Sequence, residues 1–178
     1  MHVALDTAIR WKLLKSNPVN GVQLPRVKKR EAASLETNQI AILLDAAREH
    51  DVFEFITLAV STGCRRGELL ALTWVDIDFV GRVMRVSKSI EQTREGLRVK
   101  STKTEKPREI PLAGSTIDTL RTHRSAQSEN RRLFGPDYRD DLNLVFCTPD
   151  GCHLKPDTMT AKICLLATSM IGKTERIE

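Results

Sequence analysis

The sequence predicts a mixed α/β fold that is mostly helical, with one small antiparallel sheet of three strands. Apolar residues recur at helical spacing along most of the chain, and three short segments rich in β-branched residues lie close together between residues 83 and 112. A length of 178 residues, with 40% hydrophobic and 29% charged residues, suits one compact domain with a short additional piece. This composition excludes a disordered chain and a collagen-like repeat.

The chain is expected to begin with a helix and a basic linker. Apolar residues at i, i+3, i+4 and i+8 predict a helix over residues 3–16, and an Asn-Pro pair ends it. The stretch that follows contains glycine, proline and a basic cluster with Lys28 and Lys29, without any apolar period. We therefore expect residues 1–30 to be separate from a main domain over residues 31–178.

Three helices are expected to open the main domain. Apolar spacing predicts the first over residues 37–50, with Glu36 or Thr37 as its cap. The next apolar run closes on Gly63, the residue type best able to adopt the left-handed conformation past a helix end. A third helix is expected to begin directly after this glycine, at a pair of arginines.

The predicted sheet follows these helices. Residues 83–90, 96–101 and 107–112 are short, β-branched and separated by turn or polar residues, which is typical of antiparallel strands. The polar connection between the second and third strands places Lys103 and Lys106 at a hairpin tip.

Two further helices and an extended segment complete the predicted fold. Ser115 or Thr116 caps a helix that runs to Arg132, and its weak apolar stripe places it at the surface. Residues 142–147 are expected to be a short strand or an extended segment, and residues 156–170 a last helix.

Positive charge is concentrated in two segments. Residues 1–31 and 79–110 each carry a net charge of +5, which equals the net charge of the whole chain, whereas residues 32–78 carry −5. Concentrated positive charge attracts a phosphate backbone because each neutralised phosphate releases condensed counterions. A solvated basic face without a partner is the alternative interpretation.

Other sequence features predict a cytoplasmic protein. No apolar run approaches the roughly 20 residues of a membrane helix, and the first residues lack the pattern of a secretory signal. The four cysteines are too few and too unevenly spaced for a secreted disulfide scaffold. We therefore expect free thiols and no membrane contact.

Two motifs carry residues suited to chemistry at a phosphate. The motif TGCRRGELLAL, residues 62–72, places Arg65 and Arg66 at a helix start, where free backbone N–H groups and the helix dipole also favour an anion. The motif KTEKPREIPL, which begins at Lys103, places a lysine on a hairpin that can lie over a bound ligand.

These motifs resemble the catalytic domain of the tyrosine recombinases, the phage integrase family of site-specific DNA recombinases. The family pattern T-G-x-R-x-G-E-L-x-x-L-x-W-x-D-I-D is present, followed by K-T-x-x-x-R-x-I-P-L and by L-V-F-x-T-x-x-G at residues 144–151. The resemblance extends over nearly the whole chain to Met159. It implies that residues 1–30 are a remnant of the core-binding domain and that residues 31–178 are an incomplete catalytic domain.

The resemblance implies a role for each of these residues, with no metal or other cofactor. In the family, a tyrosine attacks the scissile phosphate, two arginines and a histidine stabilise the developing charge, and the hairpin lysine protonates the leaving 5′ oxygen. Arg65 stands at the first arginine position, Lys103 at the lysine position, and Glu68 at that of the acid that supports the active-site turn. Five further basic residues are expected to contact the DNA backbone: Arg66, Lys106, Arg108, Lys28 and Lys29.

The sequence departs from the family after the L-V-F segment. The family continues with H-x-x-R and the nucleophilic tyrosine, but no H-x-x-R occurs in the 178 residues, and the single tyrosine, Tyr138, precedes L-V-F. We therefore expect a truncated, integrase-like fragment that binds double-stranded DNA, associates with other recombinase protomers, uses no small-molecule substrate and cannot cleave DNA alone.

Two other interpretations remain open. The chain is either a non-catalytic DNA-binding or regulatory module that modulates a full-length recombinase, or a polypeptide that does not fold stably. In the second case the apolar faces of Ile40, Leu58 and Leu69 stay uncovered.

The remaining candidate residues are expected to be structural. The spacing Cys147-x4-Cys152-His153 lacks a fourth metal ligand. His50 and His123 are expected to be solvated on polar helix surfaces, and Tyr138 to be a loop aromatic.

Overall fold

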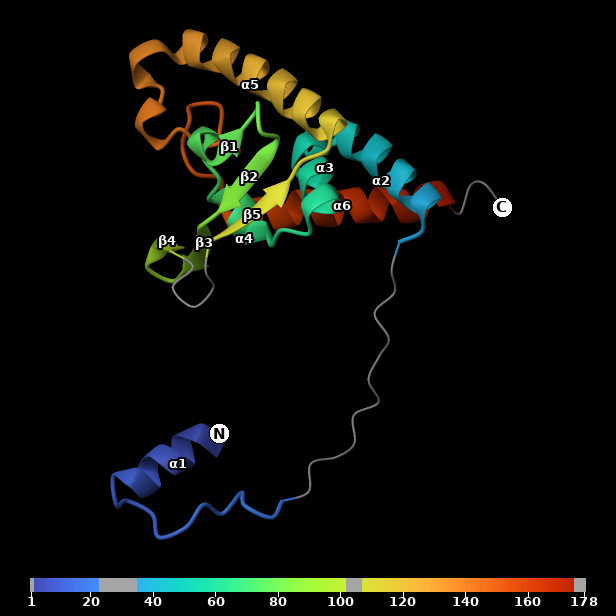
Figure 1. The fold of residues 1–178 in the computed structure, drawn as a ribbon. Helices are drawn as coiled ribbons and strands as arrows, with labels where there is room; N and C mark the ends of the chain where they lie inside the picture. Colours follow the sequence, from blue (N-terminus) through green and yellow to red (C-terminus); the bar gives the residue numbers. More distant parts are fainter. Residues whose placement is uncertain (1, 23–34, 102–106, 175–178) are drawn as a thin grey trace. The chain divides into compact units, whose positions relative to one another are not determined.

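The computed structural model describes residues 2–22, 35–101 and 107–174 (Figure 1). The chain divides into an N-terminal unit, residues 1–34, and a main unit, residues 35–178, each of which is described by itself. The N-terminal unit contains α1 (His2–Arg10) followed by turns. The helix ends earlier than predicted because the backbone leaves the helical region at Lys12, whose φ is 61°.

The first three helices of the main unit begin and end close to the predicted residues. They are α2 (Thr37–Glu49), α3 (Phe53–Thr62) and α4 (Arg66–Leu70). The backbone N–H of Glu36, at the start of α2, donates to Oε1 of Gln39 at 2.8 Å. Gly63 adopts a left-handed conformation with φ 64° and ends α3, as predicted.

The structure confirms a small three-stranded antiparallel sheet but changes its membership. The sheet consists of β1 (Ile77–Asp78), β2 (Val83–Val86) and β5 (Arg108–Pro111), in the order β1-β2-β5. The predicted strand over residues 83–90 is interrupted at Ser87, so its second half becomes a separate strand.

A second, two-stranded sheet contains the rest of the predicted strands. It pairs β3 (Lys88–Thr93) with β4 (Gly96–Ser101), and Ile90 lies opposite Val99. The prediction that the second and third strands form a direct hairpin is therefore wrong among the described residues, because β4 pairs with β3 whereas β5 pairs with β2. Lys103 and Lys106 lie outside the described residues.

The C-terminal part contains two long helices. They are α5 (Gly114–Phe134) and α6 (Pro156–Thr174), joined by two short 3-10 turns, η2 (Gly135–Asp137) and η3 (Asp140–Leu142). A bend follows η3 at residues 145–146, flanked by isolated β-bridges at Leu144 and Cys147, where a short strand or extended segment was predicted. The predicted caps at Ser115 and Thr116 are wrong, because α5 already begins at Gly114.

Two polar side chains of α5, His123 and Gln127, form hydrogen bonds to other parts of the main unit. Nε2 of His123 lies 2.8 Å from the carbonyl oxygen of Val145, and Gln127 accepts a 2.6 Å hydrogen bond from the indole N–H of Trp74. Gln127 also donates to the carbonyl oxygen of Leu144 at 3.0 Å. The expectation that His123 is simply solvated is wrong, since a polar side chain can lie inward where it finds a hydrogen-bonding partner.

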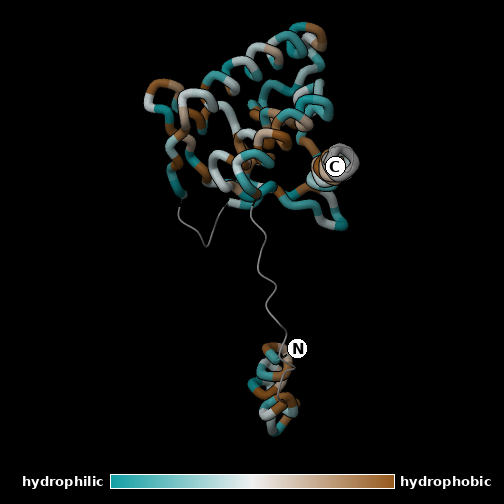
Figure 2. The backbone as a smooth tube through the Cα atoms, turned by 90° about the vertical axis from the view of Figure 1, so that its right-hand side faces the viewer, coloured by the Kyte–Doolittle hydropathy of each residue, from teal (hydrophilic) through white to brown (hydrophobic). Residues whose placement is uncertain are grey.

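One core joins the helices and the three-stranded sheet. Figure 2 shows the hydrophobic segments gathered in the interior of the main unit. Leu58 and Leu69 are completely or almost completely buried, so the expectation that their faces stay uncovered is wrong, while Ile40 is half-buried. The rings of Phe55 and Phe146 pack edge to face at 5.1 Å. No helix among the described residues is both long and apolar enough to cross a bilayer.

Gly67 allows α4 to approach β3 closely. A Cβ atom at this position would lie 2.5 Å from the carbonyl oxygen of Ile90 and 2.7 Å from Oγ of Ser89.

We expect Gly67→Ala to lower the free energy of unfolding by about 1–3 kcal/mol, although alanine is the better helix former. Urea denaturation measures the difference. Gly114→Ala, where the added Cβ meets only ordinary contacts, serves as the matched control, and equal effects of the two substitutions would contradict the steric argument.

Candidate functional site

A buried carboxylate is the centre of the site. The side chain of Glu68 is 2% exposed and accepts hydrogen bonds from both terminal nitrogens of Arg108, at 3.0 Å for Oε1 and 2.6 Å for Oε2. The backbone N–H of Arg65 donates to Oε2 at 2.8 Å, and Nη1 of Arg65 lies 3.4 Å from Oε1. Glu68 therefore joins two arginines that are 43 residues apart in the sequence.

The local sequence explains this geometry. Gly63 ends α3 in the left-handed conformation, and Arg65 has an extended conformation (φ −68°, ψ 147°) directly before α4. Glu68 follows three residues later in the first turn, so its side chain folds back onto the N–H of Arg65 in the manner of a helix cap. Arg108 reaches the same carboxylate from the first residue of β5, opposite Val86 of β2.

The arginines keep Glu68 ionised although it is buried. Burial by itself raises the pKa of Glu68, but the hydrogen bonds from Arg108 and from the Arg65 backbone, with the charges of both arginines, lower this pKa below the ordinary value of 4.5. The same hydrogen bond to Glu68 raises the pKa of Arg108. The three side chains together therefore carry a net charge of +1.

Arg65 is the most accessible member of this cluster. Its side chain is 69% exposed, compared with 37% for Arg108. A guanidinium has five N–H donors in a planar fork that matches two phosphate oxygens. Arg65 combines a fixed backbone with an accessible head group, which is an arrangement suited to binding an oxyanion.

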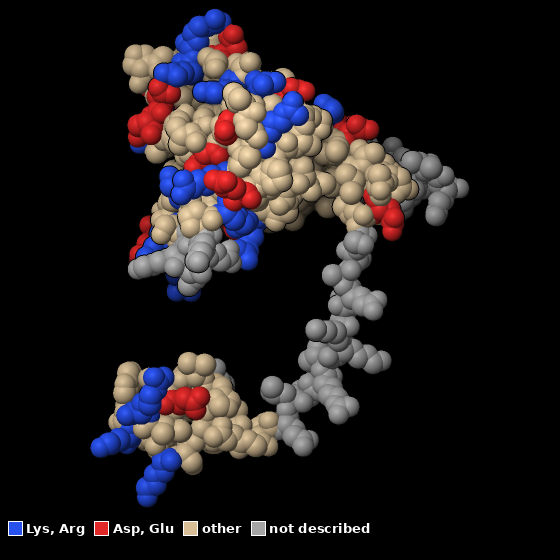
Figure 3. All heavy atoms as spheres, in the orientation of Figure 1, with Lys and Arg blue, Asp and Glu red and all other residues tan. Residues whose placement is uncertain are grey.

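Apart from Arg65 and Arg108, the predicted basic residue that lies in the described part of the chain is Arg66. Arg66 donates through Nη1 to the hydroxyl of Thr160 on α6, so its head group lies against the protein. Lys103, Lys106, Lys28 and Lys29 lie outside the described residues. Among the described residues, basic side chains are also visible around the β3–β4 ribbon in Figure 3.

Sequence reasoning missed the contact between Arg108 and Glu68 and assigned Arg108 to DNA. The strand pattern contains a usable signal, because Arg108 and Ile110 alternate with exposed residues in β5 and therefore share its inward face. A charged residue on the inward face of a strand requires a buried partner of opposite charge. Among the described residues of the main unit, Glu68 is the acidic residue that is buried.

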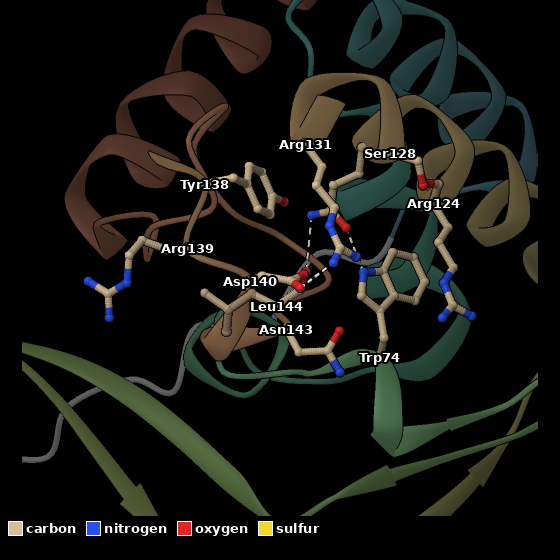
Figure 4. A pocket seen from close by; sticks show the side chains of 10 residues that line it. Trp74, Arg124, Ser128, Arg131, Tyr138, Arg139, Asp140, Asn143 and Leu144 are labelled. Atoms are coloured by element: carbon tan, nitrogen blue, oxygen red, sulfur yellow. Dashed lines mark hydrogen bonds and ion pairs between the residues drawn. The ribbon is translucent and has the colours of Figure 1, made fainter. Parts of the chain in front are cut away.

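Tyr138 lies in a separate pocket beside Trp74 and Leu144, as Figure 4 shows. Its hydroxyl is 3.6 Å from Sγ of Cys147, and burial, with that contact, raises its pKa. The ion pair between Arg131 and Asp140 occupies the same pocket. A hydroxyl with a raised pKa is a weak nucleophile.

The cysteine and histidine residues near the C-terminal part contribute to backbone structure. Cys147 and His153 form an isolated antiparallel bridge, and Gln127 donates to Sγ of Cys147 at 2.8 Å. Within residues 2–22, 35–101 and 107–174, no group of three or more histidine, cysteine, aspartate or glutamate side chains is arranged to hold a metal ion.

The fold places the protein in a class. A structure of the Tn1549 transposon integrase in complex with circular intermediate DNA superposes with a TM-score of 0.69 at 20% identity, over 99% of this chain and 56% of that one. A lambda integrase dimer bound to a COC′ core site superposes with a TM-score of 0.59 at 18% identity, over 95% of this chain and 43% of that one. The main unit thus has the fold of a tyrosine recombinase catalytic domain.

The sequence comparisons define the family. The model of the phage integrase family matches residues 33–166, and the chain belongs to this family. The XerC-like tyrosine recombinase of Caldanaerobacter subterraneus subsp. tengcongensis is 31% identical over 156 residues, which cover 78% of this chain and 40% of the relative. The ICEBs1 integrase of Bacillus subtilis is 30% identical over 127 residues, which cover 70% and 34%. The chain therefore spans less than half the length of these two relatives.

We expect Glu68→Gln to destabilise the main unit at neutral pH by about 2–4 kcal/mol, because it leaves Arg108 without its charged partner. Since the pKa of Glu68 is lowered in the folded state, the stability that its charge provides is complete above pH 4.5 and is lost as the pH falls through the lower, folded-state pKa. The difference between wild type and variant in urea denaturation should therefore shrink below about pH 4.5.

Glu129→Gln is the matched control for this prediction. Glu129 is 61% exposed and pairs with Arg132 on the surface of α5, so its substitution should change stability by less than about 1 kcal/mol. A Glu68→Gln effect that stays constant from pH 7 to pH 3 would contradict the role of the charge.

Proposed function

We propose that the chain is an integrase-like recombinase fragment that binds the phosphate backbone of double-stranded DNA. The observation that carries this proposal is the exposed guanidinium of Arg65 above a backbone that the buried Glu68 holds in place. In this proposal Arg65 binds oxygens of the scissile phosphate, Glu68 supports it, and Lys103 stands at the position of the lysine that protonates the leaving 5′ oxygen in a complete family member. This binding requires no metal, cofactor or small-molecule substrate.

The related proteins support DNA and other protomers as partners. Two structural relatives are the Tn1549 transposon integrase in complex with transposon right end DNA and a lambda integrase tetramer bound to a Holliday junction. By analogy, we assign double-stranded DNA and further recombinase protomers to this chain. Lys28, Lys29, Lys106 and Arg66 are proposed to contribute contacts to the DNA backbone.

The proposal also covers the organisation and location of the chain. Residues 1–30 correspond to the end of a core-binding domain with its linker, and residues 31–178 to part of a catalytic domain. The chain acts in the cytoplasm, where it meets DNA.

We further propose that the 178-residue polypeptide binds DNA without cutting it. Its sequence has no H-x-x-R, so it lacks the second arginine and the histidine of the family pattern. Tyr138 does not replace the nucleophile, because its partly buried hydroxyl is held against Cys147 and its pKa is raised. The site thus carries the first half of the phosphate-binding machinery.

A regulatory role is the second candidate function. One relative, 30% identical over 109 residues and covering 61% of this chain and 27% of the relative, is the "Putative defective protein IntQ" of Escherichia coli. A module that binds recombination sites without cleaving them would inhibit a full-length recombinase by competition. Addition of the chain to such a reaction tests this role: a regulatory module lowers the rate at concentrations that saturate the DNA site, and an unchanged rate at saturation would contradict it.

DNA binding should depend steeply on salt. We expect log K for a duplex to fall linearly with log salt concentration, with a slope smaller by about one for Arg65→Ala and by about two for Lys103→Ala combined with Lys106→Ala. Fluorescence anisotropy between 50 and 300 mM salt measures these slopes. Arg132→Ala, which removes a surface pair with Glu129, should leave the slope unchanged. Binding that does not depend on salt would contradict phosphate recognition.

The chain should form no covalent link to DNA. With a suicide substrate that traps cleaved intermediates, we expect no protein–DNA adduct on a denaturing gel for either wild type or Tyr138→Phe. An adduct in wild type that disappears in Tyr138→Phe would show that Tyr138 is a nucleophile after all.

A further inference from the structure

We propose that Arg108 is a positioning residue of the phosphate site and does not bind DNA itself. It holds Glu68, and through Glu68 it fixes the backbone and the guanidinium of Arg65. This inference rests on the proposed function, because it assigns phosphate binding to Arg65, and it adds a residue that controls this binding from inside the protein.

The guanidinium of Arg108 is directed inward. Both of its terminal nitrogens donate to Glu68, at 3.0 and 2.6 Å, and Nη2 also lies 3.8 Å from Sγ of the buried Cys64. A bidentate pair fixes both the distance and the plane of the two groups, which a single hydrogen bond does not. Arg108 therefore has its fork committed to the protein, whereas the side chain of Arg65 is almost twice as exposed.

The two oxygens of Glu68 transmit this constraint to Arg65. Oε2 accepts from Nη2 of Arg108 and from the backbone N–H of Arg65, while Oε1 accepts from Nη1 of each arginine. Without Arg108, the buried carboxylate would have to seek solvent or take up a proton. Either change would weaken the contacts that hold Arg65.

The same residue connects the site to the sheet. Arg108 opens β5 and lies opposite Val86 of β2, so the ion pair joins α4 to the three-stranded sheet. In the sequence, Arg108 follows Lys103 by five residues. The Arg108–Glu68 ion pair thus anchors β5, the strand that follows the lysine-bearing segment, to the turn that carries Arg65.

A double-mutant cycle on DNA affinity tests the proposal. Wild type, Arg65→Ala, Arg108→Gln and the double variant are titrated with one duplex at several salt concentrations. We expect Arg108→Gln to weaken binding in the wild-type background, but to cause no further loss beyond about twofold, and no change in salt slope, once Arg65 is alanine. A direct phosphate contact would instead add its full loss in that background and lower the slope by about one. This result would overturn the proposal.

A measurement without DNA separates this proposal from the proposed function. Hydrogen exchange of the 178-residue chain should show that Arg108→Gln accelerates exchange of the Arg65 amide, which donates to Glu68 in the wild type. Arg132→Gln, which breaks only the surface pair with Glu129, should not. If wild type fails to bind DNA, the proposed function is wrong, but the exchange result still decides whether Arg108 positions Arg65.

Arg108→Lys keeps the test decisive if Arg108→Gln does not fold. Lysine retains the charge that neutralises Glu68 but cannot form the bidentate fork. We expect this variant to melt cooperatively, with faster exchange at Arg65 and an affinity between those of wild type and Arg65→Ala. A folded Arg108→Lys variant with wild-type exchange at Arg65 and wild-type affinity would show that the fork is not needed, and would overturn the proposal.

Discussion

The buried charge of Glu68 determines how the parts of the main unit must fit together. Removing a carboxylate from water costs several kcal/mol unless charged donors surround it. Here the donors come from two distant places, the turn after α3 and the first residue of β5. Any arrangement that separates α4 from β5 takes the bidentate Arg108 partner away from this buried charge. The ion pair therefore selects one placement of the short helix α4 on the sheet, which its five residues could not specify by themselves.

Backbone geometry makes this placement possible. Gly63 takes the left-handed conformation that ends α3, and Gly67 provides the space that α4 needs against β3. Glu68 follows Gly67 directly, so the close approach of the helix to β3 and the burial of the carboxylate occur on the same turn. Gly63 and Gly67 thus allow the backbone to place Arg65 and Glu68 as the cluster requires.

The sequence predicts the strongly periodic elements and the local part of the site, but not the long-range contacts. The helices over residues 37–49 and 53–62 follow from apolar spacing and from Gly63. β1 could not be predicted, because a strand of two residues shows no hydrophobic periodicity and is defined by its pairing with β2. The inward position of His123 could not be predicted because its neighbours, the carbonyl of Val145 and the ring of Phe146, follow it by 22 and 23 residues in the sequence. Likewise, the partner of Arg108 lies 40 residues away, beyond the reach of any local spacing rule.

An acidic residue beside the proposed phosphate site is at first sight a disadvantage, because it repels the ligand. In this cluster the cost is limited by the second arginine, since one carboxylate between two guanidiniums leaves a net charge of +1. The negative charge is also buried behind Arg65, whose exposed guanidinium faces solvent. Glu68 can therefore fix the direction of Arg65 while the surface that a phosphate meets remains positive. The proposed division, with Arg65 for the ligand and Arg108 for the acid, gives each of the two arginines a separate role at the single buried acid.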